Sequence, residues 1–344
     1  MVLVNTILLA ATIVGFVSAS NVWTVNCAPL TVQRSDPIKN PGAAAGHVHA
    51  VVGSTAFSRS MGADTAKDGL LTTCDKFTDH SNYWAPQLYN MRSDGKFELM
   101  PFTGMNAYYT DYTCNYDPSG HCPQNRNPAA FPEGLRMIAG NSERRTFNKS
   151  DPWQAAILME SGNDGEQYGM PKTLGDRISG HVRFPSCWDG VNLDSADHQS
   201  HVSYPDPALG GDTQGGMCPK SHPHAMINIG AEFGWSTKGV SSPNTLVWAQ
   251  GDTTGYGFHG DFMMGWMDPS ALQQSFVNCI DNNNCPWRSF GSPTGKAPNP
   301  TTLLPQIPAP VEDVGLLAPL SALPGNNKVY KQLTIKGRKP VPDA

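Results

Sequence analysis

The sequence has little charge, and it lacks the short motifs of several common enzyme classes. Only 15% of its 344 residues are Asp, Glu, Lys or Arg, the net charge is −5, and no run of Lys and Arg occurs. Proteins that bind nucleic acid concentrate positive charge to neutralise phosphates, so we expect no nucleic-acid partner. The metalloprotease pattern HExxH and the phosphate loop GxxxxGK(S/T) are absent, and no GxSxG follows a predicted strand. These absences argue against a protease and against a phosphate-loop nucleotide site.

Long apolar runs are also missing. The longest near the N-terminus covers residues 6–17, which is too short for a comfortable membrane span. The small residues Ser18 and Ala19 follow it, as signal peptidase requires. We therefore predict a signal peptide over residues 1–19, cleavage after Ala19 or Ser20, a secreted extracellular protein and no membrane span in the mature chain. A buried helix or strand at the N-terminus is the alternative.

The eight cysteines all lie beyond this cleavage site, and none forms a CxxC pair. The missing CxxC argues against a zinc ribbon or a thioredoxin-like site, while the even number predicts full pairing in an exported chain. Proximity favours the bridges Cys114–Cys122 and Cys279–Cys285, and the remaining pairing stays open. Asn148 begins an N-glycosylation sequon, which predicts a glycoprotein.

Strand patterns outnumber helix patterns, and 34 Gly and 29 Pro punctuate them. Residues 178–184 and 225–233 alternate between apolar and polar side chains, and residues 97–101 and 245–249 also read as strands. Asp268 begins one well-marked helix. We predict a mainly β, disulfide-stabilised sandwich or jelly-roll domain over residues 21–290 with a few short helices. Prolines recur in residues 291–344, which predicts a largely disordered tail, although residues 329–335 could dock as a strand.

Histidine and aspartate cluster in three segments, which are residues 46–53, 184–204 and 251–266. The first is Gly46–Gly53, in which His47 and His49 face the same way on a strand and could bind one metal ion or serve as ligand and base. Two polar residues on a solvated strand would give the same pattern. The third is Gly251–Trp266, in which glycines interleave with His259 and Asp261. A tight hairpin explains that segment equally well.

The second segment, residues 184–204, is the densest polar stretch. It places Asp194, Asp197, His198 and His201 close together, and Cys187 anchors it to the core. A carboxylate beside an imidazole commonly orients a base or a metal ligand. A hydrogen-bonded structural loop is the alternative.

Together these segments resemble a family of secreted fungal proteins known as domain of unknown function 1996. The resemblance covers residues 36–279 and rests on 36–42, 46–57, 81–86, 131–140, 184–190, 192–205 and 251–262. It implies a fungal source and an extracellular protein, and some members are joined to wall-binding WSC modules. This chain ends instead in its Pro-rich tail. The resemblance implies no mechanism.

We predict a carbohydrate-active enzyme, a hydrolase or lyase that acts on a cell-wall polysaccharide through a His/Asp site. A glycosidase needs two carboxylates, for which Asp194 or Asp197 with Asp261 is the candidate pair, whereas a lyase would use His and Tyr. The candidate catalytic residues are His49, Asp194, Asp197, His198, His201 and Asp261. The candidate sugar-binding residues are Tyr83, Trp84, Trp188, Tyr204 and Tyr256.

The second hypothesis is a non-catalytic wall-associated protein that binds metal or glycan. Its candidate metal ligands are His47, His49, His201 and His259, which suit a divalent ion. A divalent metal ion is the one cofactor that these residues suggest, without establishing it, and we expect a monomer. We expect one cleft to be lined by the side chains of His49, Asp197, His198, His201 and His259.

Overall fold

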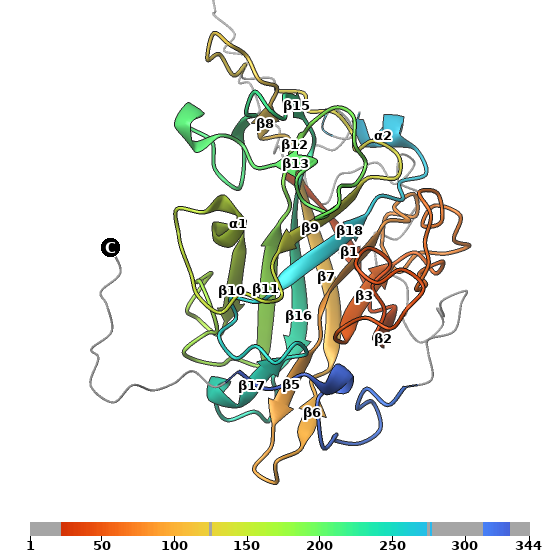
Figure 1. Cartoon of the computed structure of the whole chain (residues 1–344), viewed down its shortest axis with the longest axis vertical. Helices are drawn as coiled ribbons and strands as arrows, with labels where there is room; N and C mark the ends of the chain where they lie inside the picture. The colour runs from red at the N-terminus through yellow and green to blue at the C-terminus, as the bar shows by residue number, and fades with distance from the viewer. Residues whose placement is uncertain (1–21, 124–125, 274–275, 277–311, 331–344) are drawn as a thin grey trace, which may run out of the picture.

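The computed structural model describes residues 22–123, 126–273, 276 and 312–330. Two five-stranded antiparallel sheets face each other, and strands β9 and β18 of one cross obliquely over β11 and β16 of the other (Figure 1). The first sheet has the order β1 (Val22–Cys27), β7 (Phe102–Thr110), β16 (Asn228–Ser236), β11 (Arg177–Arg183), β10 (Ile157–Ser161). The second has the order β2 (Thr31–Gln33), β3 (His49–Gly53), β4 (Asn82–Pro86), β18 (His259–Met263), β9 (Arg136–Gly140). The expected mainly β sandwich is confirmed.

Smaller elements close the ends of this sandwich. Short sheets join β17 (Leu246–Trp248), β5 (Leu88–Met91) and β6 (Phe97–Leu99), then β13 (Val202–Ser203), β12 (Cys187–Trp188) and β15 (His224–Ala225), and finally β14 (Gly216–Met217) and β8 (Thr113–Cys114). The described helices are short: α1 (Pro152–Ala155), α2 (Pro269–Gln273), η1 (Pro207–Leu209), η2 (Pro243–Thr245) and η4 (Pro324–Asn326). Asp268 caps α2 by accepting the backbone N–H groups of Ser270 and Ala271, as predicted.

The period-2 pattern explains how the two sheets pack. Ile178 and Val182 of β11 and Ile229 and Phe233 of β16 are buried between the sheets, as their alternation predicts. The intersheet distance is small where glycines face the partner sheet. A Cβ atom on Gly260 of β18 would stand 2.9 Å from the Val182 side chain.

The second sheet is buried on both faces. Its inner face joins the sandwich core, whereas its outer face is covered by the connections from β2 to β3 and from β3 to β4. Ile38 of the first connection and Phe57 and Met61 of the second pack against Trp84 and Met263. Because these connections cover the sheet, the end of its outer face at His49 and His259 is enclosed.

Three disulfides fasten the loops: Cys27–Cys74, Cys114–Cys122 and Cys187–Cys218. The predicted bridge Cys114–Cys122 is confirmed, and the described residues contain no free cysteine. The predicted partners Cys279 and Cys285 lie outside the described residues, as does the predicted signal peptide.

Residues 312–330 differ from the disordered tail that their composition predicts. They form a strap across one end of the sandwich, drawn in blue in Figure 1, and Val314 and Leu323 are buried against Tyr89 and Val247. The strap exchanges two backbone hydrogen bonds between Leu320 and Phe97. Scattered apolar residues suffice here because the fold offers a prepared groove, which composition alone does not reveal. Residues 291–311 and 331–344 lie outside the described residues.

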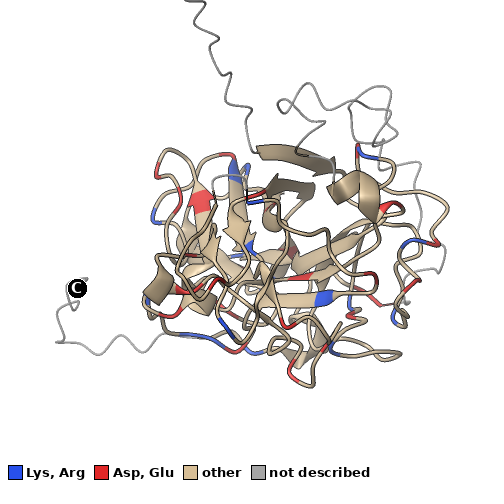
Figure 2. Ribbon diagram, turned by 90° about the horizontal axis from the view of Figure 1, so that it is seen from above, with Lys and Arg blue, Asp and Glu red and all other residues tan. Residues whose placement is uncertain are grey.

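Along the described part of the ribbon, Lys and Arg alternate with Asp and Glu in scattered positions (Figure 2). No helix among the described residues has the length and apolar character that crossing a bilayer requires. The disulfides are compatible with an extracellular protein.

One buried carboxyl group makes stability depend on pH. Asp79 accepts hydrogen bonds from the Tyr83 hydroxyl (2.8 Å) and the Ser81 backbone N–H (2.9 Å). Burial nevertheless raises the pKa of Asp79 from 3.8 to about 6. The native state therefore binds this proton more tightly than the unfolded state, so the stability it contributes is full below about pH 4 and is lost as the pH rises through about 6.

We expect Asp79→Asn to remove this dependence. Between pH 4 and pH 7 the wild type should lose about 2–3 kcal/mol of unfolding free energy relative to the variant, since one pKa unit corresponds to about 1.4 kcal/mol. Urea unfolding at the two pH values measures the difference. Parallel pH profiles for the two proteins would contradict the assignment.

Candidate metal centre

The strand register brings His49 and His259 together. Val51 pairs with Trp84, and Trp84 pairs with Asp261. Two residues further along each strand, His49 of β3 and His259 of β18 flank Pro86 of the intervening β4, on the same outer face of the sheet. Residues on alternate strands are too far apart for backbone contact but close enough for two imidazole rings to approach across a small proline.

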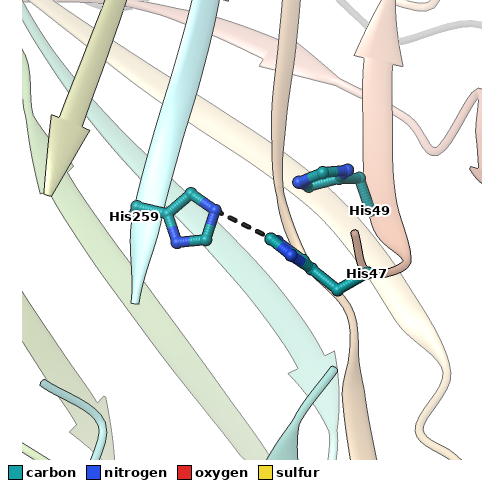
Figure 3. A group of neighbouring side chains, drawn as sticks. All are labelled: His47, His49 and His259. Atoms are coloured by element: carbon teal, nitrogen blue, oxygen red, sulfur yellow. Dashed lines mark hydrogen bonds between the residues drawn. The ribbon is translucent and has the colours of Figure 1, made fainter. Parts of the chain in front are cut away.

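His47 completes a group of three imidazoles. It precedes β3, and its ring lies 4.3 Å from the ring of His49 and 5.0 Å from that of His259, centroid to centroid. The Nε2 atoms of His47 and His259 are 3.2 Å apart (Figure 3). A nitrogen from each of the three residues lies within 4.8 Å of the others.

Two backbone carbonyls fix the orientation of the rings. The Nδ1 atom of His49 lies 3.0 Å from the Ser35 carbonyl oxygen, and that of His259 lies 2.9 Å from the Gly257 carbonyl oxygen. A carbonyl oxygen only accepts, so Nδ1 carries the proton in both rings and Nε2 presents its lone pair. The Nε2 atom of His49 is buried without a hydrogen-bond partner. This arrangement is the usual second-shell support of metal-binding histidines.

Burial also keeps the imidazoles neutral. It lowers the pKa of His49 and of His259 to about 4 and that of His47 well below its ordinary value, and the neighbouring imidazoles add to the effect at His47 and His259. Neutral imidazole is the form that binds metal. Two imidazole nitrogens on one zinc ion at about 2.05 Å with tetrahedral geometry are about 3.3 Å apart, close to the His47–His259 separation.

The cluster opens into a cavity of about 340 Å³. His47 and His259 line it, together with charged and amide side chains that include Lys39, Asp197 and Glu143. Asp197 reaches the cavity because Gln199 donates to the carbonyl oxygens of Ile138 and Gly140, and Gly140 pairs with His259. Backbone N–H groups, Ser200 first, hold the pKa of Asp197 well below its ordinary value, so this wall carries a negative charge.

Comparison with protein families assigns these segments to one domain. The model of a domain of unknown function, DUF1996, matches residues 36–266, and this range contains all three histidines. The chain belongs to the DUF1996 family. Comparison with curated proteins and with solved structures gives no match. The matched range begins where the resemblance predicts and ends before Cys279.

A second carboxyl group of the DUF1996 domain lies beneath the histidines. Asp261 follows His259 on the same strand face, is 1% exposed, and neither of its oxygens has a hydrogen-bond partner. Burial raises its pKa well above the ordinary value, and the nearby Asp36 adds to the rise. Burial thus favours the neutral form of Asp261, and its side chain does not line the cavity.

The other predicted histidines of the DUF1996 domain do not join the cluster. Both ring nitrogens of His201 are occupied, by Ser195 Oγ at 2.9 Å and by the Arg136 carbonyl oxygen at 2.7 Å. His198 is bonded through Nδ1 to Asp194 at 2.8 Å. The structure thus brings together His47, His49 and His259, with Asp197 on the cavity wall, whereas the first candidate set for the metal also included His201.

Three predicted sugar-binding aromatics are core residues. Tyr83 and Trp84 have no exposed surface, and Tyr204 is 2% exposed with its hydroxyl donating to the Arg183 carbonyl oxygen. None of them has a free face for a sugar ring, because the long loop over the second sheet and the opposing sheet cover them. Trp188 and Tyr256 are partly exposed, and neither lines the cavity at the histidines.

Sequence reasoning missed several residues of this cavity. Asp36 and Lys39 come from the loop after β2, and Asn327 comes from the C-terminal strap, where its side chain donates to the Gly46 carbonyl oxygen next to His47. No sequence pattern marks Asn327 as a residue of the site, because its position depends on how residues 312–330 pack against the domain. Asp36 lies within the first residues that carry the family resemblance, which was the available clue.

Proposed function

We propose that this protein is an extracellular metalloprotein in which His47, His49 and His259 bind one divalent transition-metal ion. The observation that carries the proposal is the convergence of three neutral imidazoles, two of which are anchored through Nδ1 to backbone carbonyls so that Nε2 faces the shared point. Imidazole ligands suit zinc and copper, and zinc commonly takes three protein ligands when it is catalytic. The disulfides support the extracellular location.

The three-histidine cluster faces a cavity on one side, and this favours a catalytic metal site over a purely structural one. A structural zinc site has four protein ligands, whereas three ligands leave one position for water or substrate. That position faces the 340 Å³ cavity because His47 and His259 line it. A metal ion there would polarise a substrate oxygen or lower the pKa of a bound water.

The cavity walls suit a substrate rich in hydroxyl groups. Amide side chains of Asn40, Asn141, Gln250 and Asn327 line it together with Asp197 and Lys39, so the walls contain both hydrogen-bond donors and acceptors. We therefore propose that the substrate is a polysaccharide, cleaved by hydrolysis or elimination; a metal ion held by His47, His49 and His259 would supply the polarising or water-activating chemistry. A non-catalytic metal site would bind the ion equally well but release no product.

A two-carboxylate glycosidase is not supported by the same geometry. Such an enzyme places two accessible carboxyl groups on either side of the scissile bond. Asp261 is buried and does not reach the cavity, and Asp194 is engaged by His198 and lies 3.9 Å from Arg136. Of the candidate pair, only Asp197 is accessible from the cavity.

Titration of metal-free protein with Co²⁺ and Zn²⁺ tests the proposal. We expect one equivalent of Co²⁺ to produce the intense visible bands of a low-coordinate site, and one equivalent of Zn²⁺ to displace it. Product release from polysaccharide by the zinc form but not by the metal-free form supports catalysis. Binding without turnover supports the non-catalytic alternative, and the absence of Co²⁺ bands contradicts the metal centre itself.

A further inference from the structure

A second cavity lies on the outer face of the first sheet, on the opposite side of the sandwich from the histidines. Because Ile178 and Val182 point into the core, His181 and Arg183 of β11 point outward. The same alternation turns Glu232 of β16 outward. These side chains form the floor of a cavity of about 380 Å³, which we call the outer pocket; its principal lining residues are Tyr108, Glu160, Glu166, His181, Arg183 and Glu232.

The charges of the outer pocket hold one another in place. The His181 ring lies between two carboxylates, with Nε2 3.2 Å from Glu160 and Nδ1 3.2 Å from Glu166. Arg183 pairs with Glu166 at 2.8 Å. The walls are therefore ordered before any ligand arrives, which lowers the entropic cost of binding.

Glu232 anchors the opposite side of the outer pocket. It accepts hydrogen bonds from the Tyr108 hydroxyl (2.8 Å), from Arg177 (2.6 Å) and from Ser179 (3.1 Å). Tyr108 remains 37% exposed although its hydroxyl is fixed. The phenol ring thus presents a rigid apolar surface beside a hydrogen-bonding edge.

The floor of the outer pocket is open at Gly230. A Cβ atom built on this glycine would meet only the Cβ atom of Tyr108, at 3.9 Å, and the backbone is not in the left-handed region. The space above Gly230 is therefore free volume at the bottom of the pocket. Larger residues are compatible with the strand conformation at this position.

The chemistry of the outer pocket selects the class of ligand. Arg183 is paired with Glu166 and Arg177 with Glu232, so no surplus positive charge is available for a phosphate or a polyanion. A sugar ring carries hydroxyl groups at its edge and C–H groups on its face, which match the polar floor and the phenol of Tyr108. We propose that the outer pocket binds one ring of a neutral glycan, independently of the metal centre.

Gly230→Leu fills the pocket, and Gly230→Ala is its matched control, because the shorter side chain stays in ordinary contact with Tyr108. The probes are soluble hexasaccharides of β-1,3-linked glucose, β-1,4-linked glucose and β-1,4-linked N-acetylglucosamine, measured by calorimetry, with oligogalacturonate as the charged comparison. We expect the wild type and Gly230→Ala to bind at least one neutral probe and Gly230→Leu to bind it at least tenfold more weakly.

Glycan binding is measured on metal-free protein, and Co²⁺ binding should be equal in all three proteins, which separates this proposal from the metal centre. The proposal is overturned if the wild type binds none of the neutral probes, if Gly230→Leu binds as tightly as Gly230→Ala, or if oligogalacturonate is preferred.

Discussion

His47→Ala is expected to lower the affinity for Zn²⁺ at least about 100-fold. Loss of a hydrogen-bond partner behind a metal-binding histidine already lowers metal affinity about 10–100-fold, and loss of a ligand itself removes more. His47 is the appropriate member of the cluster to replace, because it is partly exposed and precedes β3, whereas His49 and His259 are buried within strands. The change should therefore affect the metal more than the fold. Competition against a chromogenic chelator measures the affinity.

The matched control is His198→Asn. His198 belongs to the neighbouring polar segment, bonds to Asp194, and has a φ of 59°, a conformation that asparagine tolerates well. We expect this variant to bind Zn²⁺ as the wild type does. Equal losses in both variants would show that the polar segment, and not the three-imidazole cluster, controls the metal.

Removal of residues 312–344 is expected to lower the unfolding free energy by about 3 kcal/mol, which corresponds to a melting temperature about 6–12 °C lower. Val314 and Leu323 each bury an apolar side chain worth about 1.5–3 kcal/mol, partly offset by the entropy of ordering the strap. The buried Tyr89 hydroxyl would also lose its acceptor, the Val314 carbonyl oxygen. Thermal unfolding followed by circular dichroism measures the shift.

The control for this truncation is a chain that ends at Tyr330. It keeps every described contact of the strap, including the backbone bond from Tyr330 to Gly251, and should melt as the full chain does. A melting temperature unchanged by the longer deletion would show that the strap contributes nothing, as a disordered tail would.

The fold class could be predicted because burial follows a local pattern. The alternation in residues 178–184 and 225–233 gives the buried face of β11 and β16 directly, since a strand places every second side chain inward. Proximity likewise identified the Cys114–Cys122 bridge. Both features depend on residues that are close in sequence.

The candidate site could be predicted only in part, because its geometry depends on strand pairing. Local pattern shows that His47 and His49 face alike, but only the order β3-β4-β18 brings His259 to them and leaves His201 aside. Burial of Tyr83 and Trp84 depends on a loop that covers the second face of the sheet. Sequence alternation cannot distinguish a covered outer face from one that is open to a sugar.

Part of the outer pocket follows from the alternation of side chains along β11. The same alternation that buries Ile178 and Val182 necessarily places His181 and Arg183 together on the other face. Glu160, which contacts His181, and Glu232, which stands opposite His181 in the strand register, lie on neighbouring strands, so the grouping needs the order β10-β11-β16. The outward-facing polar residues of a strand are therefore predictable from sequence, whereas their neighbours on other strands are not.

Metal content per chain tests the central claim most directly. The protein should be secreted by a host grown with zinc and copper in the medium, purified without a metal-affinity tag, and analysed by inductively coupled plasma mass spectrometry beside His47→Ala. The account predicts about one equivalent of a single transition metal in the wild type and a small fraction of that in the variant. A folded wild-type protein that contains no stoichiometric metal and takes up none on dialysis against Zn²⁺ or Cu²⁺ would contradict it.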